Sequence, residues 1–189
     1  MQDAGATGEE RELVRRVLAG DREAFRLVVL RHQARLAELV FRQTGDRAGT
    51  DDMVQETFLR AYRALDRFDP RFRLSTWLAR IAVNVARDQG RRAKVREDGL
   101  QRVAARGAGA PSPLEAAARS EAHDQVAQAL RDLPEPQREV VVLATYGGLT
   151  QREVAAALDL PLGTVKTRHR TALLRLRELV APLGPGGAP

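Results

Sequence analysis

The stretch LTQREVAAALDLPLGTVKTRHR, residues Leu149–Arg170, has the pattern of two helices joined by a short turn. Thr150 can cap a first helix whose Val154 and Leu158 point inward, and Val165 can anchor a second helix beneath the first. In helix-turn-helix proteins the second helix enters the major groove of DNA with its N-terminal residues at the base edges. A solvated basic helix is the alternative, but the small-residue first helix and the short turn favour DNA binding.

The second helix of this motif is basic in its first half and apolar in its second half. Arginine can bind guanine through two hydrogen bonds, and lysine and threonine can hold phosphates or bases. The candidate contacts to duplex DNA are Lys166, Thr167, Arg168 and Arg170. The apolar residues of the second half are expected to pack on their own domain; they are Ala172, Leu173, Leu176 and Leu179.

Helical patterns continue on both sides of the motif. Apolar spacing, capping residues and Gly or Pro breaks predict helices over 9–19, 21–43, 51–65, 76–92, 114–133, 135–146, 151–158 and 163–180. Between them, residues 93–113 are small, polar and interrupted by Gly and Pro, with no sustained apolar face. The sequence therefore predicts an all-α protein with two small helical domains, residues 1–92 and 114–183. A flexible linker, 93–113, joins them, and a disordered tail, 184–189, follows.

The composition limits the classes of function. A net charge of +6 suits a polyanionic partner, although a merely soluble, arginine-rich surface would give the same value. The chain has no cysteine, its three histidines lack metal-ligand spacing, and no glycine-rich phosphate loop or catalytic motif occurs. We therefore expect no enzyme activity, catalytic residues, metal or cofactor. No apolar run could span a bilayer and no signal-peptide pattern is present, so we expect a cytoplasmic protein that is not membrane-embedded.

The segment 51–65 has two different faces. One face is expected to be buried; it carries Met53, Val54, Thr57, Phe58, Ala61 and Tyr62. The opposite face carries Asp52, Gln55, Glu56, Leu59 and Arg63. We call the acidic, polar part of this face, from Asp52 to Leu59, the α-stripe; its residues are Asp52, Gln55, Glu56 and Leu59. A lone exposed leucine needs no explanation, whereas an acidic stripe with an apolar centre also suits docking onto a partner helix. Spacing alone supports both interpretations equally.

The segment 76–92 also has two faces, and a loop rich in arginine and phenylalanine precedes it. Its second face carries Arg80, Asn84, Arg87 and Arg91, and the loop RFDPRFR carries Phe68, Arg71, Phe72 and Arg73. Cations for phosphates and flat rings for unstacked bases are what single-stranded DNA binding needs. The alternative is that the rings belong to the core and the arginines are solvated. For Trp77 we favour the core, because it shares a face with Ile81.

Three segments together resemble a known family. They are DDMVQETFLRAYRALDRFDP (51–70), LSTWLARIAVNVARDQGRR (74–92) and ALRDLPEPQREVVVLATYGGLTQREVAAALDLPLGTVKTR (129–168). In this order they are similar to region 2 and region 4 of extracytoplasmic-function (ECF, group IV) sigma factors. The resemblance implies that the chain binds core RNA polymerase and directs it to promoters. It also implies that region 4 reads the −35 element as duplex, that region 2 melts and captures the −10 element as a single strand, and that an anti-sigma factor holds the protein inactive.

The resemblance assigns roles by position. Asp52, Gln55, Glu56 and Leu59 fall where the family contacts the coiled coil of the largest polymerase subunit. Phe68 and Asn84, with the loop through Arg71 and Arg73, fall where a flipped −10 base is held, and Arg80, Arg87 and Arg91 continue that face. The positions at which the family reads the −35 element are occupied here by Lys166, Thr167, Arg168, Arg170 and Thr171.

Two positions depart from the family pattern. Leu74 stands where many members have an aromatic residue, and Thr171 stands where an arginine is common. The resemblance therefore does not determine which promoter sequence this chain prefers.

Two other classes of protein remain as alternatives. A conventional helix-turn-helix regulator with an N-terminal sensor or dimerisation domain would bind duplex DNA tightly without polymerase. A pure interaction protein would use its basic surfaces on acidic partners.

Overall fold

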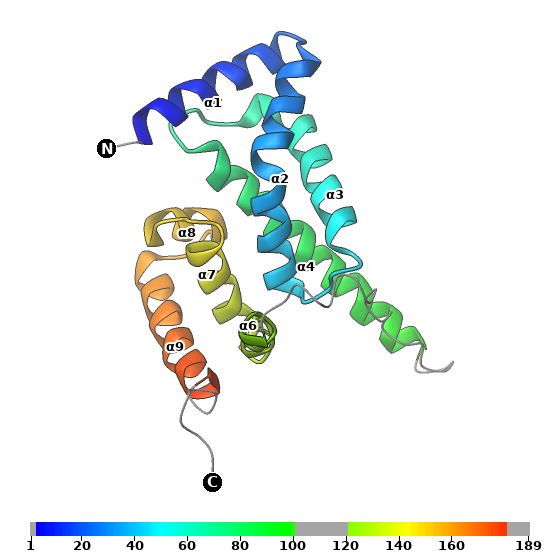
Figure 1. Ribbon diagram of the computed structural model, residues 1–189, viewed down its shortest axis with the longest axis vertical. Coiled ribbons are helices and arrows are strands. Elements are labelled where there is room, and N and C mark those ends of the chain that lie inside the picture. The colour runs from blue at the N-terminus through cyan, green and yellow to red at the C-terminus, as the bar shows by residue number, and fades with distance from the viewer. Residues whose placement is uncertain (1–2, 101–120, 181–189) are drawn as a thin grey trace.

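The structure, a computed structural model, describes residues 3–100 and 121–180, with side chains for residues 8–92 and 125–180. Within these ranges it contains eight α-helices, one short 3-10 helix and no strand, which confirms the predicted all-α class (Figure 1). The helices are α1 (Asp3–Leu18), α2 (Arg22–Thr44), α3 (Thr50–Arg63), η1 (Leu65–Arg67), α4 (Leu74–Leu100), α6 (Glu121–Arg131), α7 (Glu135–Thr145), α8 (Gln151–Leu158) and α9 (Leu162–Val180). The predicted linker after Leu100, the predicted helical residues 114–120 and the predicted tail 184–189 lie outside the described residues.

Helices α1 to α4 form an N-terminal unit around α2. Figure 1 shows α1 across one end of α2, with α3 and α4 running beside it. Asp21 starts α2 as predicted, because its Oδ1 accepts a hydrogen bond from the backbone N–H of Ala24 at 3.1 Å. The helix ends at Gly45, whose positive φ of 71° favours glycine. A Cβ at Gly45 would also lie 2.6 Å from Cδ of Arg131, so glycine permits a close approach of α6.

The predicted buried face of α3 is confirmed except at one residue. Met53, Val54, Thr57, Phe58 and Ala61 are buried. The hydroxyl of Thr57 donates to the carbonyl of Met53 at 2.7 Å, which satisfies this polar group inside the core. Tyr62 was expected on the same face but is 47% exposed. It lies at the edge of that face, where its ring packs against Phe25 with centroids 4.9 Å apart.

Helix α4 is longer than the sequence predicts. It begins at Leu74 and continues to Leu100, through the first part of the predicted linker. Residues 93–100, AKVREDGL, offer no sustained apolar face, which is the reason that periodicity alone assigns them to a linker. Alanine, lysine, arginine and glutamate are good helix formers, and extending an existing helix needs no new nucleus.

Helices α6 to α9 form a C-terminal unit that contains the predicted helix-turn-helix. Thr150 and Glu153 form a reciprocal capping box at the start of α8. Asp159 ends α8 with a φ of 54°, the left-handed conformation that explains why glycine is common at this position. Helix α9 buries Val165 and Ala172. The expected burial of its second half is wrong for Leu173, which is 48% exposed.

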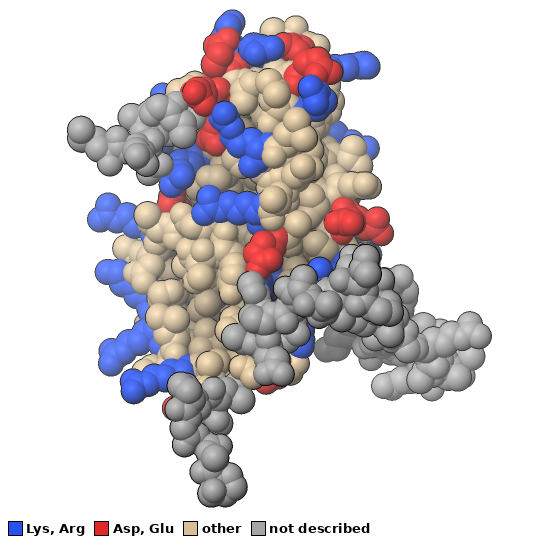
Figure 2. Space-filling model, viewed as in Figure 1, with Lys and Arg blue, Asp and Glu red and all other residues tan. Residues whose placement is uncertain are grey.

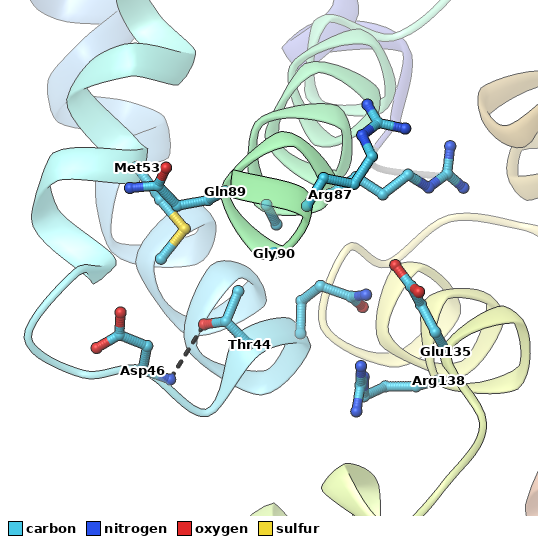
Figure 3. Close-up of a pocket in the computed structure, with 11 residues that line it drawn as sticks. Thr44, Asp46, Met53, Arg87, Gln89, Gly90, Glu135 and Arg138 are labelled. Carbon is cyan, nitrogen blue, oxygen red and sulfur yellow. Dashed lines mark hydrogen bonds between the residues drawn. The ribbon is translucent and has the colours of Figure 1, made fainter. Parts of the chain in front are cut away.

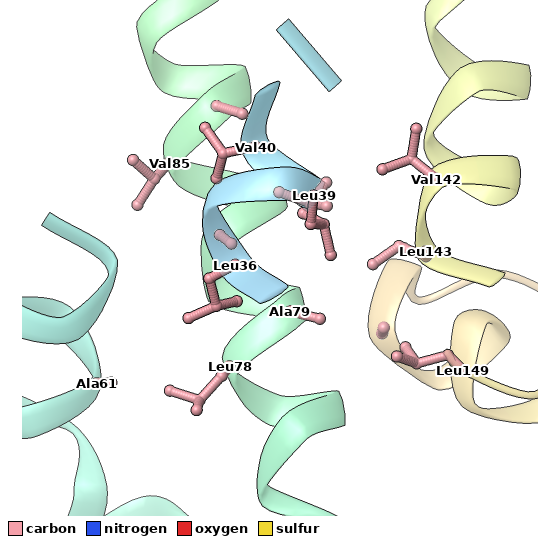
Figure 4. Packing of buried hydrophobic residues seen from close by; sticks show 14 of the residues in the cluster. Leu36, Leu39, Val40, Ala61, Leu78, Ala79, Val85, Val142, Leu143 and Leu149 are labelled. Atoms are coloured by element: carbon pink, nitrogen blue, oxygen red, sulfur yellow. The ribbon is translucent and has the colours of Figure 1, made fainter. Parts of the chain in front are cut away.

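The two units share one apolar core. Figure 4 shows Leu36 and Leu39 of α2 and Leu78 and Ala79 of α4 in the same cluster as Val142 and Leu143 of α7 and the following Leu149. Helix α4 packs on α8, and α2 packs on α6 and α7. The sequence predicted two domains joined by a linker and gave no indication of this direct packing.

Candidate functional site

The α-stripe lies on the solvent side of α3. Asp52 and Gln55 are exposed, and Leu59 is 50% exposed. Glu56 is half-buried, and its carboxylate accepts a hydrogen bond from Nε of Arg60 at 2.7 Å. The opposite face of α3 packs on α2 and α4, which leaves the stripe uncovered by the described residues of its own chain. An apolar groove of ≈ 550 Å³ runs beside the stripe, lined by Arg22, Phe25, Val29, Gln55, Phe58, Leu59 and Tyr62.

A second pocket, which we call the ring pocket, lies between the loop before α4 and the C-terminal unit. Its volume is ≈ 200 Å³, and its lining comprises Arg67, Phe68, Asp69, Phe72, Thr76, Trp77, Arg80, Ala156 and Ala157. Phe68 is only 8% exposed and packs against Trp77 with ring centroids 5.4 Å apart. Phe72, by contrast, is 50% exposed. The pocket therefore combines aromatic surface with the cation of Arg80.

The predicted cationic residues of the N-terminal unit are only partly brought together. Arg80 lines the ring pocket and is exposed, and Asn84 is exposed further along α4. Arg91 is exposed and forms an ion pair with Asp88. Arg71 lies in the loop with its side chain 85% exposed and bound to the carboxylate of Asp69 at 2.6 Å.

Two further predicted arginines are less accessible. Arg73 is half-buried at the start of α4. Arg87 is half-buried on α4, where its guanidinium donates two hydrogen bonds to the carboxylate of Glu139, at 2.6 and 2.7 Å. These hydrogen bonds raise the pKa of Arg87. Glu139 comes from α7, so the ion pair joins the two units.

Sequence reasoning missed Glu139, although a signal for it exists. The signal is its position directly before the apolar run Val140, Val141, Val142 and Leu143. In the structure Glu139 is only 3% exposed. A carboxylate at such a position is almost never buried without a partner. Sequence reasoning also missed the contact between Thr76 and Glu153. The hydroxyl of Thr76 donates a hydrogen bond to Oε1 of Glu153 at 3.0 Å, which joins the two units.

A polar cleft of ≈ 380 Å³ lies at the same boundary. Figure 3 shows Arg87, Gln89 and Gly90 of α4 opposite Glu135 and Arg138 of α7. The end of α2 and the following loop close the cleft, where the backbone N–H of Asp46 donates to the hydroxyl of Thr44 at 3.2 Å. The cleft contains both cations and carboxylates and has no single sign of charge.

The N-terminal half of α9 presents its polar residues to solvent. Lys166, Thr167, Arg170 and Thr171 are exposed and Arg168 is half-buried. Figure 2 shows basic side chains following one another along the outer edge of α8 and α9, whereas basic and acidic side chains mix over α1. Helix α9 packs on α6, α7 and α8 through its other face. The helix-turn-helix therefore leaves the basic face of its second helix, α9, accessible to solvent.

Neither a metal nor a membrane site emerges from the described residues. Within residues 3–100 and 121–180, no three His, Asp or Glu side chains gather in a way that could bind a metal ion. None of the helices in these ranges combines the length and the hydropathy needed to cross a bilayer.

The comparisons with known proteins agree with this geometry. The family model "Sigma-70 region 2" matches residues 28–96, and "Sigma-70, region 4" matches residues 129–178. The "ECF RNA polymerase sigma-E factor" of Salmonella typhimurium is 38% identical over 182 residues, which cover 90% of this chain and 94% of that protein. The chain belongs to the ECF sigma factor family. The resemblance noted in the sequence is thus confirmed, and the conventional helix-turn-helix regulator is disfavoured.

Two solved structures have the same fold as this sigma factor. CnrH in complex with the cytosolic domain of CnrY has a TM-score of 0.69 and 32% identity, covering 93% of this chain and 99% of CnrH. The sigma factor RpoE in complex with the anti-sigma factor NepR, from Bartonella quintana, has a TM-score of 0.70 and 25% identity. That match covers 83% of this chain and 96% of RpoE.

Proposed function

We propose that this sigma factor binds core RNA polymerase, with no catalytic role of its own, and directs it to promoters in the cytoplasm. The observation that carries this proposal is the presence of three separate surfaces on one chain. They are the α-stripe on α3, the aromatic and cationic face beside the ring pocket, and the basic face of α9. Three partners can thus be held together: polymerase, single-stranded DNA and duplex DNA.

The α-stripe is the proposed docking site for polymerase. Asp52, Gln55 and Glu56 supply negative charge and hydrogen-bonding groups around Leu59. A basic partner helix with an apolar contact point complements such a surface. Each DNA-binding unit alone is expected to bind promoter DNA with modest affinity. Once polymerase holds both units, binding of one unit to the promoter places the other at a high effective concentration near its own element, so the complex binds more tightly than either unit.

The N-terminal unit is the proposed −10 reader. An extruded base can stack on aromatic rings while arginines hold the flanking phosphates. Phe68, with Asn84 exposed on the same helix face as Arg80, carries this role, and Arg71, Arg73, Arg87 and Arg91 extend the cationic path. Extruding a base costs a few kcal/mol, which stacking and phosphate contacts offset.

The C-terminal unit is the proposed −35 reader. Lys166, Thr167, Arg168, Arg170 and Thr171 lie on the half of α9 that a helix-turn-helix inserts into the major groove. We also propose that an anti-sigma factor regulates this chain, since one solved structure of the same fold is bound to such a factor.

Footprinting tests the proposal. Purified core polymerase and the chain are assembled, and the holoenzyme selects fragments of genomic DNA from the source organism. We expect duplex protection near −35 and permanganate-reactive thymines near −10, neither of which core polymerase gives alone. Tight duplex protection by the chain without polymerase, and no reactive thymines with it, would support the conventional helix-turn-helix regulator instead.

A further inference from the structure

The polar cleft between α4 and α7 contains hydrogen-bonding groups that the described chain leaves unused. Its volume of ≈ 380 Å³ is within the roughly 300–1,000 Å³ typical of small-molecule sites. The lining comes from the end of α2 and the following loop, from α3 and α4, and from the first turn of α7. Three of the lining residues belong to none of the surfaces assigned above to polymerase or DNA; they are Gln43, Glu135 and Arg138.

The side-chain amide of Gln43, at the end of α2, is the first of these unused groups. Gln43 is only 4% exposed and lines the cleft, yet its Oε1 accepts no hydrogen bond from any described residue. Buried polar atoms are nearly always hydrogen-bonded, because an unpaired one has lost its hydrogen bonds to water without replacement. A ligand in the cleft that donates a hydrogen bond to Gln43 would supply the missing partner.

The start of α7 adds a cation and an anion to the cleft. Nε of Arg138 is buried without an acceptor, although Nη1 of the same guanidinium donates to the carbonyl of Arg131 at 3.2 Å. Glu135 lies one turn earlier and forms no hydrogen bond or ion pair among residues 8–92 and 125–180, although its charge acts on Arg87. Figure 3 shows Glu135 and Arg138 on the side of α7 that faces α4 and the end of α2.

Most other polar groups of the cleft already have partners within the chain. The cleft residues with such partners are Thr44, Asp46, Arg87 and Arg91. The cleft also has an apolar wall, because Met53 and Ala86 line it and are buried. A ligand therefore meets an unpaired acceptor, a cation with a free donor, a carboxylate and an apolar surface.

We propose that this cleft binds a small zwitterionic metabolite of the α-amino acid type. The ligand's carboxylate accepts from Arg138, because a planar guanidinium suits a carboxylate. Its ammonium group donates to Oε1 of Gln43 and to the carboxylate of Glu135, and its side chain lies against Met53. A purely anionic ligand such as phosphate is disfavoured, because it would meet the charge of Glu135.

The site goes beyond the proposed function, since its argument uses neither polymerase nor DNA. Gln43 belongs to the N-terminal unit, and Glu135 and Arg138 belong to the C-terminal unit. The ligand thus contacts both units at once, and neither unit alone carries all of its binding groups.

Saturation-transfer NMR on the full chain tests the proposal, with each of the standard amino acids as a separate probe and calorimetry to follow. We expect at least one amino acid to bind at a single site with a Kd of about 1 mM or tighter. The ligand controls are the N-acetylated and the amidated forms of the best probe, each of which lacks one of the two charges. Each control should bind about tenfold more weakly, because a charge-assisted hydrogen bond is lost.

Variants of α7 place the ligand in the cleft. Arg138→Met should weaken binding by about tenfold or more, and Glu135→Gln should weaken it less, because glutamine keeps an acceptor oxygen. The matched controls are Arg175→Met and Glu178→Gln, the same changes at exposed positions of α9, which should bind as the wild type does.

Gln43→Met separates a binding role from a structural one. Methionine has nearly the length of glutamine and no unpaired amide oxygen, so the ligand-free variant should resist urea at least as well as the wild type. Its affinity for the amino acid should nevertheless fall by about fivefold or more. A purely structural role for Gln43 predicts the reverse, which is lower stability with unchanged binding by the folded chain.

Two results would overturn the proposal. If no amino acid binds the wild-type chain saturably, the cleft holds water only. If binding survives unchanged in both Arg138→Met and Gln43→Met, the ligand lies elsewhere on the chain. Neither result bears on the proposed sigma activity, which is measured with polymerase and DNA.

Discussion

Replacing Leu59 should weaken polymerase binding by an amount that the structure sets. Full burial of a leucine side chain contributes roughly 1.5–3 kcal/mol. Leu59 is already 50% covered in the free chain, so docking can gain only about half of that, roughly 1 kcal/mol. We therefore expect Leu59→Ala to raise the Kd for core polymerase by about fivefold.

Leu59→Arg should have a much larger effect. A partner that complements the acidic α-stripe is basic, so an arginine at its centre adds like-charge repulsion and the cost of removing a charge from water. We expect binding to fall by more than about a hundredfold, since these effects add to the lost apolar contact. Because the position is exposed, the free energy of unfolding should change by no more than about 0.5 kcal/mol.

The assay is a fluorescence anisotropy titration of labelled chain with purified core polymerase, with urea unfolding of each variant alongside. Leu27→Ala is the matched control, because Leu27 is a 41% exposed leucine on α2 outside the α-stripe. Its Kd should equal that of the wild type. Wild-type affinity in Leu59→Arg, or equal losses in Leu59→Ala and Leu27→Ala, would refute the assignment of the α-stripe to polymerase.

Four further predictions concern the DNA surfaces and the helix-turn-helix. Asn84→Ala should reduce heparin-resistant open complexes while leaving duplex −35 binding by the holoenzyme unchanged. Arg170→Ala should weaken −35 duplex binding and reduce the slope of its salt dependence by about one. Thr150→Ala should lower the free energy of unfolding by about 1 kcal/mol in urea denaturation, because α8 loses its N-cap. Burial alone would raise the pKa of Glu153, but hydrogen bonds from Thr150 and Thr76 and the charge of Arg73 outweigh it and lower the pKa below 4.5. The stability that Glu153 contributes is therefore present above pH 4.5 and lost as the pH falls through its lowered pKa, and Glu153→Gln should flatten this part of the stability profile.

Each of these predictions has a contradicting result. Loss of both open complexes and −35 binding in Asn84→Ala would contradict the assignment of −10 and −35 recognition to different units. An unchanged salt slope in Arg170→Ala would place that side chain away from phosphates. Full stability in Thr150→Ala, or the same acid profile in Glu153→Gln as in the wild type, would show that the capping box contributes little.

Much of the fold follows from local signals in the sequence. Asp21 as the N-cap of α2 and Thr150 as the cap of α8 are correct because capping depends on a few neighbouring residues. The left-handed turn at Asp159 falls where the helix-turn-helix pattern places it. The end of α4 was missed because residues 93–100 carry helix propensity without an apolar face, and periodicity detects only the face.

The contact between the units could not be predicted, because it depends on tertiary packing. Arg87 and Glu139 are far apart in sequence, and neither helix pattern indicates that they meet. The sequence placed Arg87 on an open DNA-binding face, whereas the structure pairs it across the units. Similarly, Leu173 lies in a cluster of apolar residues in the sequence, yet it is 48% exposed, whereas α9 buries Val165 and Ala172.

Run-off transcription with purified core polymerase tests the central claim most directly. Fragmented genomic DNA from the source organism is transcribed with and without the chain, under conditions in which core polymerase alone starts only from fragment ends. The account predicts discrete transcripts that require the chain and disappear with Leu59→Arg. A transcript pattern that is identical with and without the wild-type chain would contradict it.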